Sequence, residues 1–178
     1  MDRELIVSAA LELTLEKGLE ALSLRSLATR LEVKAPSLYW HFESKQDLFA
    51  AMGERLLRQC LDGMDAHDGW ETWLFSFGRQ LWRAQVSMRD SGRLLMAIRA
   101  NAVGTERFSQ SVADKLAPFG LSYATANMMQ WSVQALITGW LTFHQAGDCK
   151  FEDQVEASAM DSLRVLVDGW KSHGQGAS

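Results

Sequence analysis

The side chains best suited to chemistry lie between Ser23 and Phe49, in the stretch SLRSLATRLEVKAPSLYWHFESKQDLF. Between Ser23 and Lys45 this stretch holds four basic residues and only two acidic ones. Local positive charge of this kind can neutralise phosphates, and small polar groups beside it can reach base edges. His41 has no orienting acid three or four residues away, which disfavours a catalytic base there. The stretch therefore indicates nucleic-acid binding rather than catalysis.

The net charge of the whole chain is not typical of a nucleic-acid-binding protein. The formal net charge is −4 at pH 7, and residues 1–50 hold six Lys or Arg against eight Asp or Glu. Phosphate neutralisation depends on the charge that faces the duplex, so an acidic remainder does not exclude DNA binding. It does predict weak non-specific binding.

Two short helices joined by a tight turn would position these side chains. Ser23 can cap a helix whose apolar residues, spaced 3, 1 and 3 apart, share one face. Those apolar residues are Leu24, Leu27, Ala28 and Leu31. Residues 32–34 are too few for anything but a turn, and Pro36 suits the first turn of a helix predicted over 36–41. Ser44, with Asp47 three residues later, is an acidic variant of the capping box for a third helix. This pattern is typical of a helix-turn-helix DNA reader.

The rest of the chain predicts an all-α fold. It contains two prolines and no window with the sustained alternation of a β-sheet. Apolar periodicity predicts further helices over 2–17, 45–65, 70–88, 93–100, 104–118, 122–146 and 151–170. The polar break at 65–69 marks a candidate domain boundary, and residues 173–178 are predicted to be a disordered tail. Trp40 and Phe42 are predicted to be core residues that hold the second short helix in place.

Cysteine usage and hydropathy indicate a cytoplasmic protein without a metal or cofactor. Cys60 and Cys149 are far apart and belong to no ligand set, so two reduced thiols are expected. The N-terminus enters a charged amphipathic helix at once, which does not resemble a signal peptide. No uninterrupted apolar run is long enough to span a bilayer, so no membrane partner is expected.

The N-terminal amphipathic helix, Gly18, the Ser cap and the run LATRLEVKAPSLYWHFESKQDLF together resemble the tetracycline-repressor (TetR) family of transcriptional regulators. The pattern covers residues 1–55, while WETWLFSFGRQLWRAQVSMRD and ALITGWLTFHQAGD look like the ligand-binding domain of the tetracycline-repressor subgroup. The resemblance implies a helix-turn-helix DNA-binding domain over 1–47 and a ligand-binding and dimerisation domain over 48–172. It further implies a homodimer through the last two long helices, which binds double-stranded operator DNA and responds to a small-molecule effector.

The resemblance also implies which residues contact DNA. They are Arg25, Lys34, Ala35, Pro36, Ser37, Tyr39, His41 and Lys45. Arg25 would reach a guanine edge or a phosphate, and residues 34–37 form the recognition-helix end where base contacts concentrate. Tyr39, His41 and Lys45 would bind backbone phosphates. Ala35 stands where the subgroup has an adenine-reading glutamine, so the operator should differ from the tetracycline operator.

An apolar effector pocket is the second implied site. Its predicted lining is Leu61, Trp73, Phe77, Leu81, Met96, Arg99, Met128, Met129, Trp131 and Gln134. Taken singly, the aromatic and Met residues of this set are more often core, whereas together they suit an adaptable pocket. Polar residues nearby, Arg99, Asn101, Gln130 and Gln134, could each orient a ligand or lie at the surface.

The chemistry of the effector is predicted from two differences between this sequence and the tetracycline-repressor subgroup. Leu61 and Phe77 fall where the subgroup has polar drug contacts, and Leu95 or Met96 falls where it has a magnesium-binding histidine. A hard cation needs oxygen ligands and waters, so the prediction is a largely apolar effector without a metal.

The apolar stripes of the last two long helices predict the subunit interface. The dimer bundle is predicted to contain Trp140, Phe143, Leu163, Val167 and Trp170, because apolar stripes of this kind need a cover. The alternative is a helical small-molecule binding protein or enzyme with a hydrophobic pocket and no role in DNA binding. The sequence shows no catalytic triad, metal set or glycine-rich phosphate loop, which favours a regulator over an enzyme.

Overall fold

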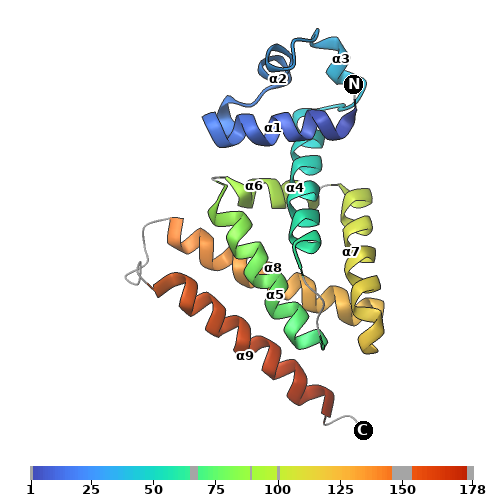
Figure 1. Ribbon diagram of the computed structural model, residues 1–178, viewed down its shortest axis with the longest axis vertical. Coiled ribbons are helices and arrows are strands. Elements are labelled where there is room, and N and C mark those ends of the chain that lie inside the picture. The colour runs from blue at the N-terminus through green and yellow to red at the C-terminus, as the bar shows by residue number, and fades with distance from the viewer. Residues whose placement is uncertain (1, 65–67, 89, 100, 146–153, 176–178) are drawn as a thin grey trace. The chain divides into compact units, whose positions relative to one another are not determined.

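The computed structural model describes residues 2–64, 68–88, 90–99, 101–145 and 154–175, apart from the side chains of Arg99 and residues 173–175. Helices form nearly all of these ranges, and no strand occurs within them (Figure 1). The α-helices are α1 (Arg3–Lys17), α2 (Leu24–Arg30), α3 (Pro36–Tyr39), α4 (Lys45–Asp62), α5 (Trp70–Val86), α6 (Ser91–Arg99), α7 (Ala102–Leu116), α8 (Tyr123–Gln145) and α9 (Val155–Gln175). Two 3-10 helices, η1 (Leu19–Ala21) and η2 (Ala117–Phe119), follow α1 and α7. The predicted all-α class is confirmed.

The chain divides into two compact units. The first comprises residues 1–58 and 87–108, and the second comprises residues 59–86 and 109–178. The division falls inside α4 and α7, so each of these helices contributes to both units. The functional domains predicted over 1–47 and 48–172 remain a prediction beside this geometric division.

The first unit is built around the three N-terminal helices. Its core includes Leu27 of α2, Leu38 of α3 and Leu48 of α4, all fully buried, together with Leu94 of α6. A four-residue helix such as α3 is too short to be stable alone, so this packing is what stabilises it. The core therefore fixes the orientation of the turn and of α3.

Local signals explain where these helices begin and end. The Ser26 N–H donates to Ser23 Oγ at 2.9 Å and the Ser23 N–H donates to Ser26 Oγ at 2.9 Å, which forms a reciprocal capping box. Gly18 ends α1 at a φ of 79°, and its N–H donates to the Thr14 carbonyl. Pro36 occupies the first turn of α3. The cap predicted at Ser23 is confirmed.

Trp40 corrects one core prediction. Phe42 is completely buried as predicted, but the Trp40 side chain is 89% exposed. Phe42 follows Leu38 by four residues and returns to the same side of the helix, whereas Trp40 follows Leu38 by two and lies on the opposite side. A short helix buries only one side, so the second large ring stays in solvent.

In the second unit α5, α8 and α9 pack against one another (Figure 1). Trp73 and Phe77 stack within α5, with ring centroids 5.5 Å apart. Gly78 allows α9 to come close, because a Cβ added there would lie 2.4 Å from Leu163 Cδ2. The α9 helix extends to Gln175, into the tail predicted to begin at His173, and residues 176–178 lie outside the described ranges.

The predicted dimer set divides between the interior and the surface of one chain. Leu163 and Val167 are buried within the single subunit, so they belong to its own core rather than to an exposed interface. Trp140 and Trp170 are half-buried, and Phe143 is 67% exposed. Periodicity identified the apolar face of α9 but could not show that α5 covers part of it.

Candidate nucleic-acid interface

The residues predicted to read bases lie at the start of α3. Lys34, Pro36 and Ser37 are exposed, whereas Ala35 is half-buried and packs against the core of the first unit. The Ser37 N–H donates to the Lys34 carbonyl at 2.9 Å, which closes the first turn. The exposed side of this turn therefore presents Lys34, Pro36 and Ser37, while Ala35 also anchors the helix.

Three predicted DNA-contacting cations have no carboxylate partner. Arg25, Lys34 and Lys45 are exposed, and no acidic group of the described ranges lies within 4.0 Å of their charged nitrogens. The Lys45 ammonium lies 5.2 Å from the centroid of the Phe49 ring, which orients this side chain without neutralising it. These three cations are thus available for phosphates.

Five other arginines of the first unit form ion pairs within the protein. Ion pairs join Arg3 to Asp47, Arg30 to Glu12 and Glu16, Arg55 to Glu4, Arg58 to Glu4 and Glu54, and Arg93 to Glu20. Most of the acidic residues that make this part of the chain negative are therefore balanced locally. Between residues 25 and 45 the described cations Arg25, Lys34 and Lys45 remain unpaired, against the unpaired acids Glu32 and Glu43. The local balance is therefore positive although the net charge of the whole chain is negative.

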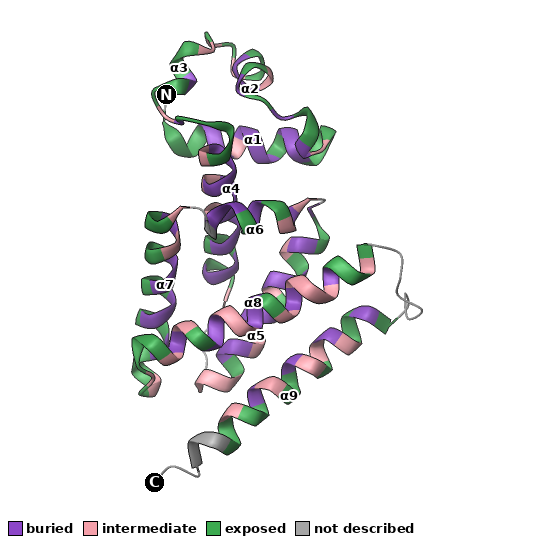
Figure 2. Cartoon of the chain, turned by 180° about the vertical axis from the view of Figure 1, so that it is seen from behind, coloured by how far each residue is buried: buried purple, intermediate pink, exposed green. Residues whose placement is uncertain are grey.

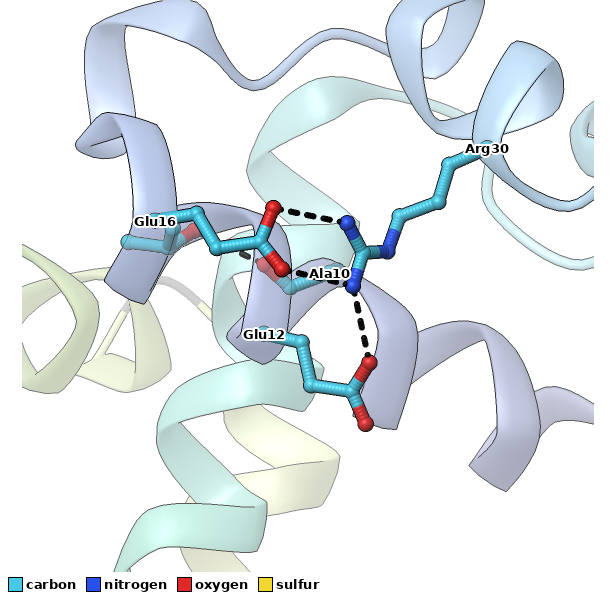
Figure 3. A network of polar contacts seen from close by, with 5 residues as sticks. Ala10, Glu12, Glu16 and Arg30 are labelled. Atoms are coloured by element: carbon cyan, nitrogen blue, oxygen red, sulfur yellow. Dashed lines mark hydrogen bonds and ion pairs between the residues drawn. The ribbon is translucent and has the colours of Figure 1, made fainter.

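Arg30 positions the helix-turn-helix against α1 (Figure 3). Its guanidinium donates to both Glu16 carboxylate oxygens at 2.8 Å and to Glu12 Oε2 at 3.1 Å. The hydrogen bonds from Arg30 lower the pKa of Glu16, and those to Glu16 and Glu12 raise the pKa of Arg30. This network holds the end of α2 on two successive turns of α1.

A second contact joins α6 to the end of α1. The Leu19 N–H donates to Asp90 Oδ2 at 3.4 Å, and Arg93 pairs with Glu20. The hydrogen bond from Arg93 lowers the pKa of the Glu20 carboxyl. Asp90 directly precedes α6 and adopts a φ of 68°. Its carboxylate thus connects the start of α6 to η1.

Aromatic side chains continue the exposed surface beyond Ser37. Most of α3 is exposed (Figure 2). Tyr39 is exposed and His41 is half-buried. Trp40, which was assigned to the core, is the most exposed large hydrophobic residue described. Its position two residues after the buried Leu38 was the available signal that it faces outward.

The predicted effector residues are distributed over both units. Leu61, Trp73, Phe77, Leu81, Met129 and Gln134 are buried in the second unit, Trp131 is half-buried and Met128 is exposed. Met96 is exposed and belongs to the first unit, and the Arg99 side chain lies outside the described part of the chain. Hence six of the ten form a buried group within one unit, and the pocket as a whole stays a prediction.

The described ranges contain neither a candidate metal cluster nor a candidate membrane span. No cluster of three or more His, Cys, Asp or Glu side chains converges there, and no helix there is long and apolar enough to cross a membrane. Burial raises the pKa of the Cys60 thiol to about 12, so this group stays protonated at neutral pH. Cys149, the other predicted thiol, lies outside the described ranges.

Comparison with known proteins gives the same class of protein. Residues 6–52 match the family model described as bacterial regulatory proteins, tetR family. The tetracycline repressor protein class C of Escherichia coli is 30% identical over 168 residues, covering 93% of this chain and 76% of the relative.

Two solved structures have the same fold. A TetR variant from Acinetobacter baumannii AYE in complex with minocycline has a TM-score of 0.79 and 27% identity, covering 97% of both chains. BioQ with its natural double-stranded DNA operator has a TM-score of 0.69 and 26% identity, covering 95% of this chain and 97% of BioQ.

An all-helical chain whose N-terminal helix-turn-helix presents unpaired cations is a DNA-binding transcriptional regulator. The chain belongs to the tetR family of bacterial regulatory proteins, and tetracycline repressors are among its relatives. It is a regulator and not an enzyme, so the alternative without a role in DNA binding is not supported.

Proposed function

We propose that this protein is a cytoplasmic repressor that binds a palindromic operator as a homodimer and releases it when a small effector binds. The observation that carries the proposal is the set of unpaired cations, Arg25, Lys34 and Lys45, around the exposed start of α3. BioQ, whose structure holds its operator, supports the DNA-binding part. Two half-sites would be separated by about 34–36 Å or a multiple of it.

The exposed residues would divide between positioning and reading. Lys45, Tyr39 and His41 would bind phosphates and set the register, since contacts of this kind are independent of sequence. Residues 34–37 would supply base contacts, and Arg25 would bind a guanine edge or a phosphate. Because Ala35 offers only a methyl group and is half-buried, Ser37 becomes the main polar reader at this end of α3.

The homodimer would form through α8 and α9. Phe143 of α8 and Val165 of α9 remain largely exposed, and Trp140 and Trp170 are half-buried. Apolar side chains on two long neighbouring helices favour association with a second copy. Leu163 and Val167 would act indirectly, because they fix α9 against its own subunit.

The effector would bind in the predicted domain over 48–172. Buried apolar side chains on α5 and α8, including Trp73, Phe77 and Met129, support a largely apolar ligand. The minocycline complex of the A. baumannii relative supports small-molecule control. Leu61 and Phe77 cannot supply polar drug contacts, so tetracyclines themselves should be poor effectors here.

Mobility shift and footprinting on the intergenic DNA that flanks the gene would test the operator. We expect Lys45→Ala to weaken binding to all sequences about equally, because it removes a phosphate contact. Ser37→Ala should change which operator is preferred. Lys115→Ala, which removes an exposed lysine of α7, is the matched control and should bind as the wild type does.

Two outcomes would overturn the proposal. One is the absence of any protected palindrome, both in the flanking DNA and in a genome-wide selection. The other is equal behaviour of Lys45→Ala and Ser37→Ala on a panel of operators, which would contradict the division into positioning and reading residues.

A further inference from the structure

A row of polar residues runs along one side of α8, which is otherwise strongly apolar. Asn127, Gln130, Gln134 and Thr138 are spaced three, four and four residues apart, so they share one side of the helix. Gln130 and Gln134 are buried, and Asn127 and Thr138 are half-buried. A polar row at this depth requires hydrogen-bond partners.

Gln130 is at the centre of this row and is only partly satisfied. Its side chain is 0% exposed, and its Nε2 donates to Gln134 Oε1 at 2.8 Å. The Gln130 Oε1 atom accepts no hydrogen bond from any described group. Gln130 Oε1 is thus a buried hydrogen-bond acceptor without a donor among the described groups.

The neighbours of Gln130 repeat this chemistry. Asn127 Oδ1 and Thr138 Oγ1 are also buried atoms without a hydrogen-bond partner among the described groups. The Asn127 Nδ2 atom is already bonded to the Tyr123 carbonyl at 3.0 Å, so its amide oxygen is the group left over. The three open atoms lie on one side of one helix, and each can accept a hydrogen bond.

The same unit contains buried aromatic side chains on a helix that packs against α8. Helix α5 packs against α8 and carries the stacked rings of Trp73 and Phe77. A mostly apolar site with a few convergent polar groups is the usual form of a small-molecule site. The polar row would then discriminate among ligands of similar size, because a buried acceptor without a partner favours a molecule that donates a hydrogen bond to it.

We propose that Gln130, assisted by Asn127 and Thr138, is the polar anchor of the effector site. The effector would be a predominantly apolar ring compound that carries a hydrogen-bond donor, such as a phenol, alcohol or amide N–H. This inference rests on the proposed control by an effector. It narrows the class of effector from a largely apolar ligand to a largely apolar ligand that carries a hydrogen-bond donor.

Matched probe pairs test the proposal without knowledge of the natural effector. The pairs are 2-naphthol with 2-methoxynaphthalene, 4-phenylphenol with 4-methoxybiphenyl, and indole with 1-methylindole, so that one methyl group removes each donor. Binding to the purified full chain is measured by calorimetry, and release of the operator by mobility shift. We expect at least one donor to bind about tenfold or more tightly than its methylated partner, the effect of one buried hydrogen bond.

Two variants assign that preference to Gln130. Gln130→Met keeps the length of the side chain and removes its acceptor, so it should abolish the preference while operator binding is retained. Gln145→Met, an exposed position on the same helix, should keep the preference. The comparison of probe pairs on the wild type remains decisive even if Gln130→Met does not fold.

The outcomes separate this inference from the proposed function. If the wild type binds its operator but binds both members of every pair equally, prefers the methylated members, or binds none, the inference is wrong and the repressor remains. If Gln130→Met keeps the preference, the anchor is not Gln130. If no preparation binds operator DNA, the proposed function itself fails.

Discussion

Arg30 shows how a single side chain positions the DNA-reading helices. It connects α2 to the carboxylates of Glu12 and Glu16 on α1, and all three side chains keep contact with solvent. Ion pairs of this kind contribute little to the free energy of unfolding when isolated, but a bidentate pair adds geometric specificity. Its main effect is therefore on the orientation of α2.

The network makes stability dependent on pH in a defined direction. Because the pKa of Glu16 in the folded protein lies below its ordinary value of 4.5, the pair stabilises the fold above that value and is lost as the pH falls through the lowered pKa. We expect Arg30→Met to reduce the loss of unfolding free energy between about pH 5 and about pH 3. Urea denaturation at several pH values measures this slope, with Arg79→Met as the exposed control. Equal slopes for Arg30→Met and the wild type would contradict the role of the network.

Glu32 is a strained residue in the turn between α2 and α3. Its φ of 55° lies in the left-handed region, which costs a residue with a side chain about 1–2 kcal/mol. Glycine adopts this conformation freely but loses about 0.5–1 kcal/mol of chain entropy. We therefore expect Glu32→Gly to raise the unfolding free energy by up to about 1 kcal/mol. Glu43→Gly, at a position of ordinary φ, should not stabilise the protein, and a loss of stability in Glu32→Gly would contradict the argument.

Some of these residue roles follow from the sequence and others require the fold. The cap at Ser23 depends on Ser26 three residues away, so local spacing predicted it. The partners of Arg30 lie 14 and 18 residues away on another helix, and only tertiary packing brings them together. The aromatic character of Trp40 favours the core, but its position opposite Leu38 places it in solvent.

At the scale of the elements, the crossing of α5 and α9 depends on one glycine. A Cβ at Gly78 would lie 2.4 Å from Leu163 Cδ2 and 3.2 Å from Val133 Cγ1, and Leu163 is completely buried. We expect Gly78→Ala to lower the unfolding free energy by about 1–3 kcal/mol, as overpacking of a core does. Chemical denaturation measures the change, and Arg79→Ala on the exposed side of α5 should stay within about 0.5 kcal/mol of the wild type. A Gly78→Ala variant as stable as the wild type would show that α9 can shift freely.

The long C-terminal helices show the limit of periodicity as a guide. Apolar periodicity predicted helices over 122–146 and 151–170, with apolar stripes that need a cover. The structure assigns Val133 and Leu163 to contacts within the subunit, and it leaves Phe143 in solvent. Periodicity identifies an apolar face but not its partner, because the same face can pack against a helix of its own chain or against a helix of a second copy.

At the scale of the whole molecule, charge and function no longer conflict. The chain carries a net charge of −4, yet arginines pair with most of the acidic residues around the helix-turn-helix. A negative total with a local positive surface favours specific over non-specific DNA binding, because the rest of the protein repels the duplex. The family resemblance predicted the helix-turn-helix contacts but not which cations would remain unpaired.

The salt dependence of operator binding tests this account most directly. If each subunit presents Arg25, Lys34 and Lys45, two subunits neutralise about six phosphates, and log affinity should fall against log salt concentration with a slope of about −5. Fluorescence anisotropy with a labelled operator at several salt concentrations gives the slope for the wild type. Lys45→Ala, which removes one phosphate-binding cation from each subunit, should make it shallower by about 2. A wild-type slope near zero, or one unchanged in Lys45→Ala, would contradict the claim that these unpaired cations bind the operator.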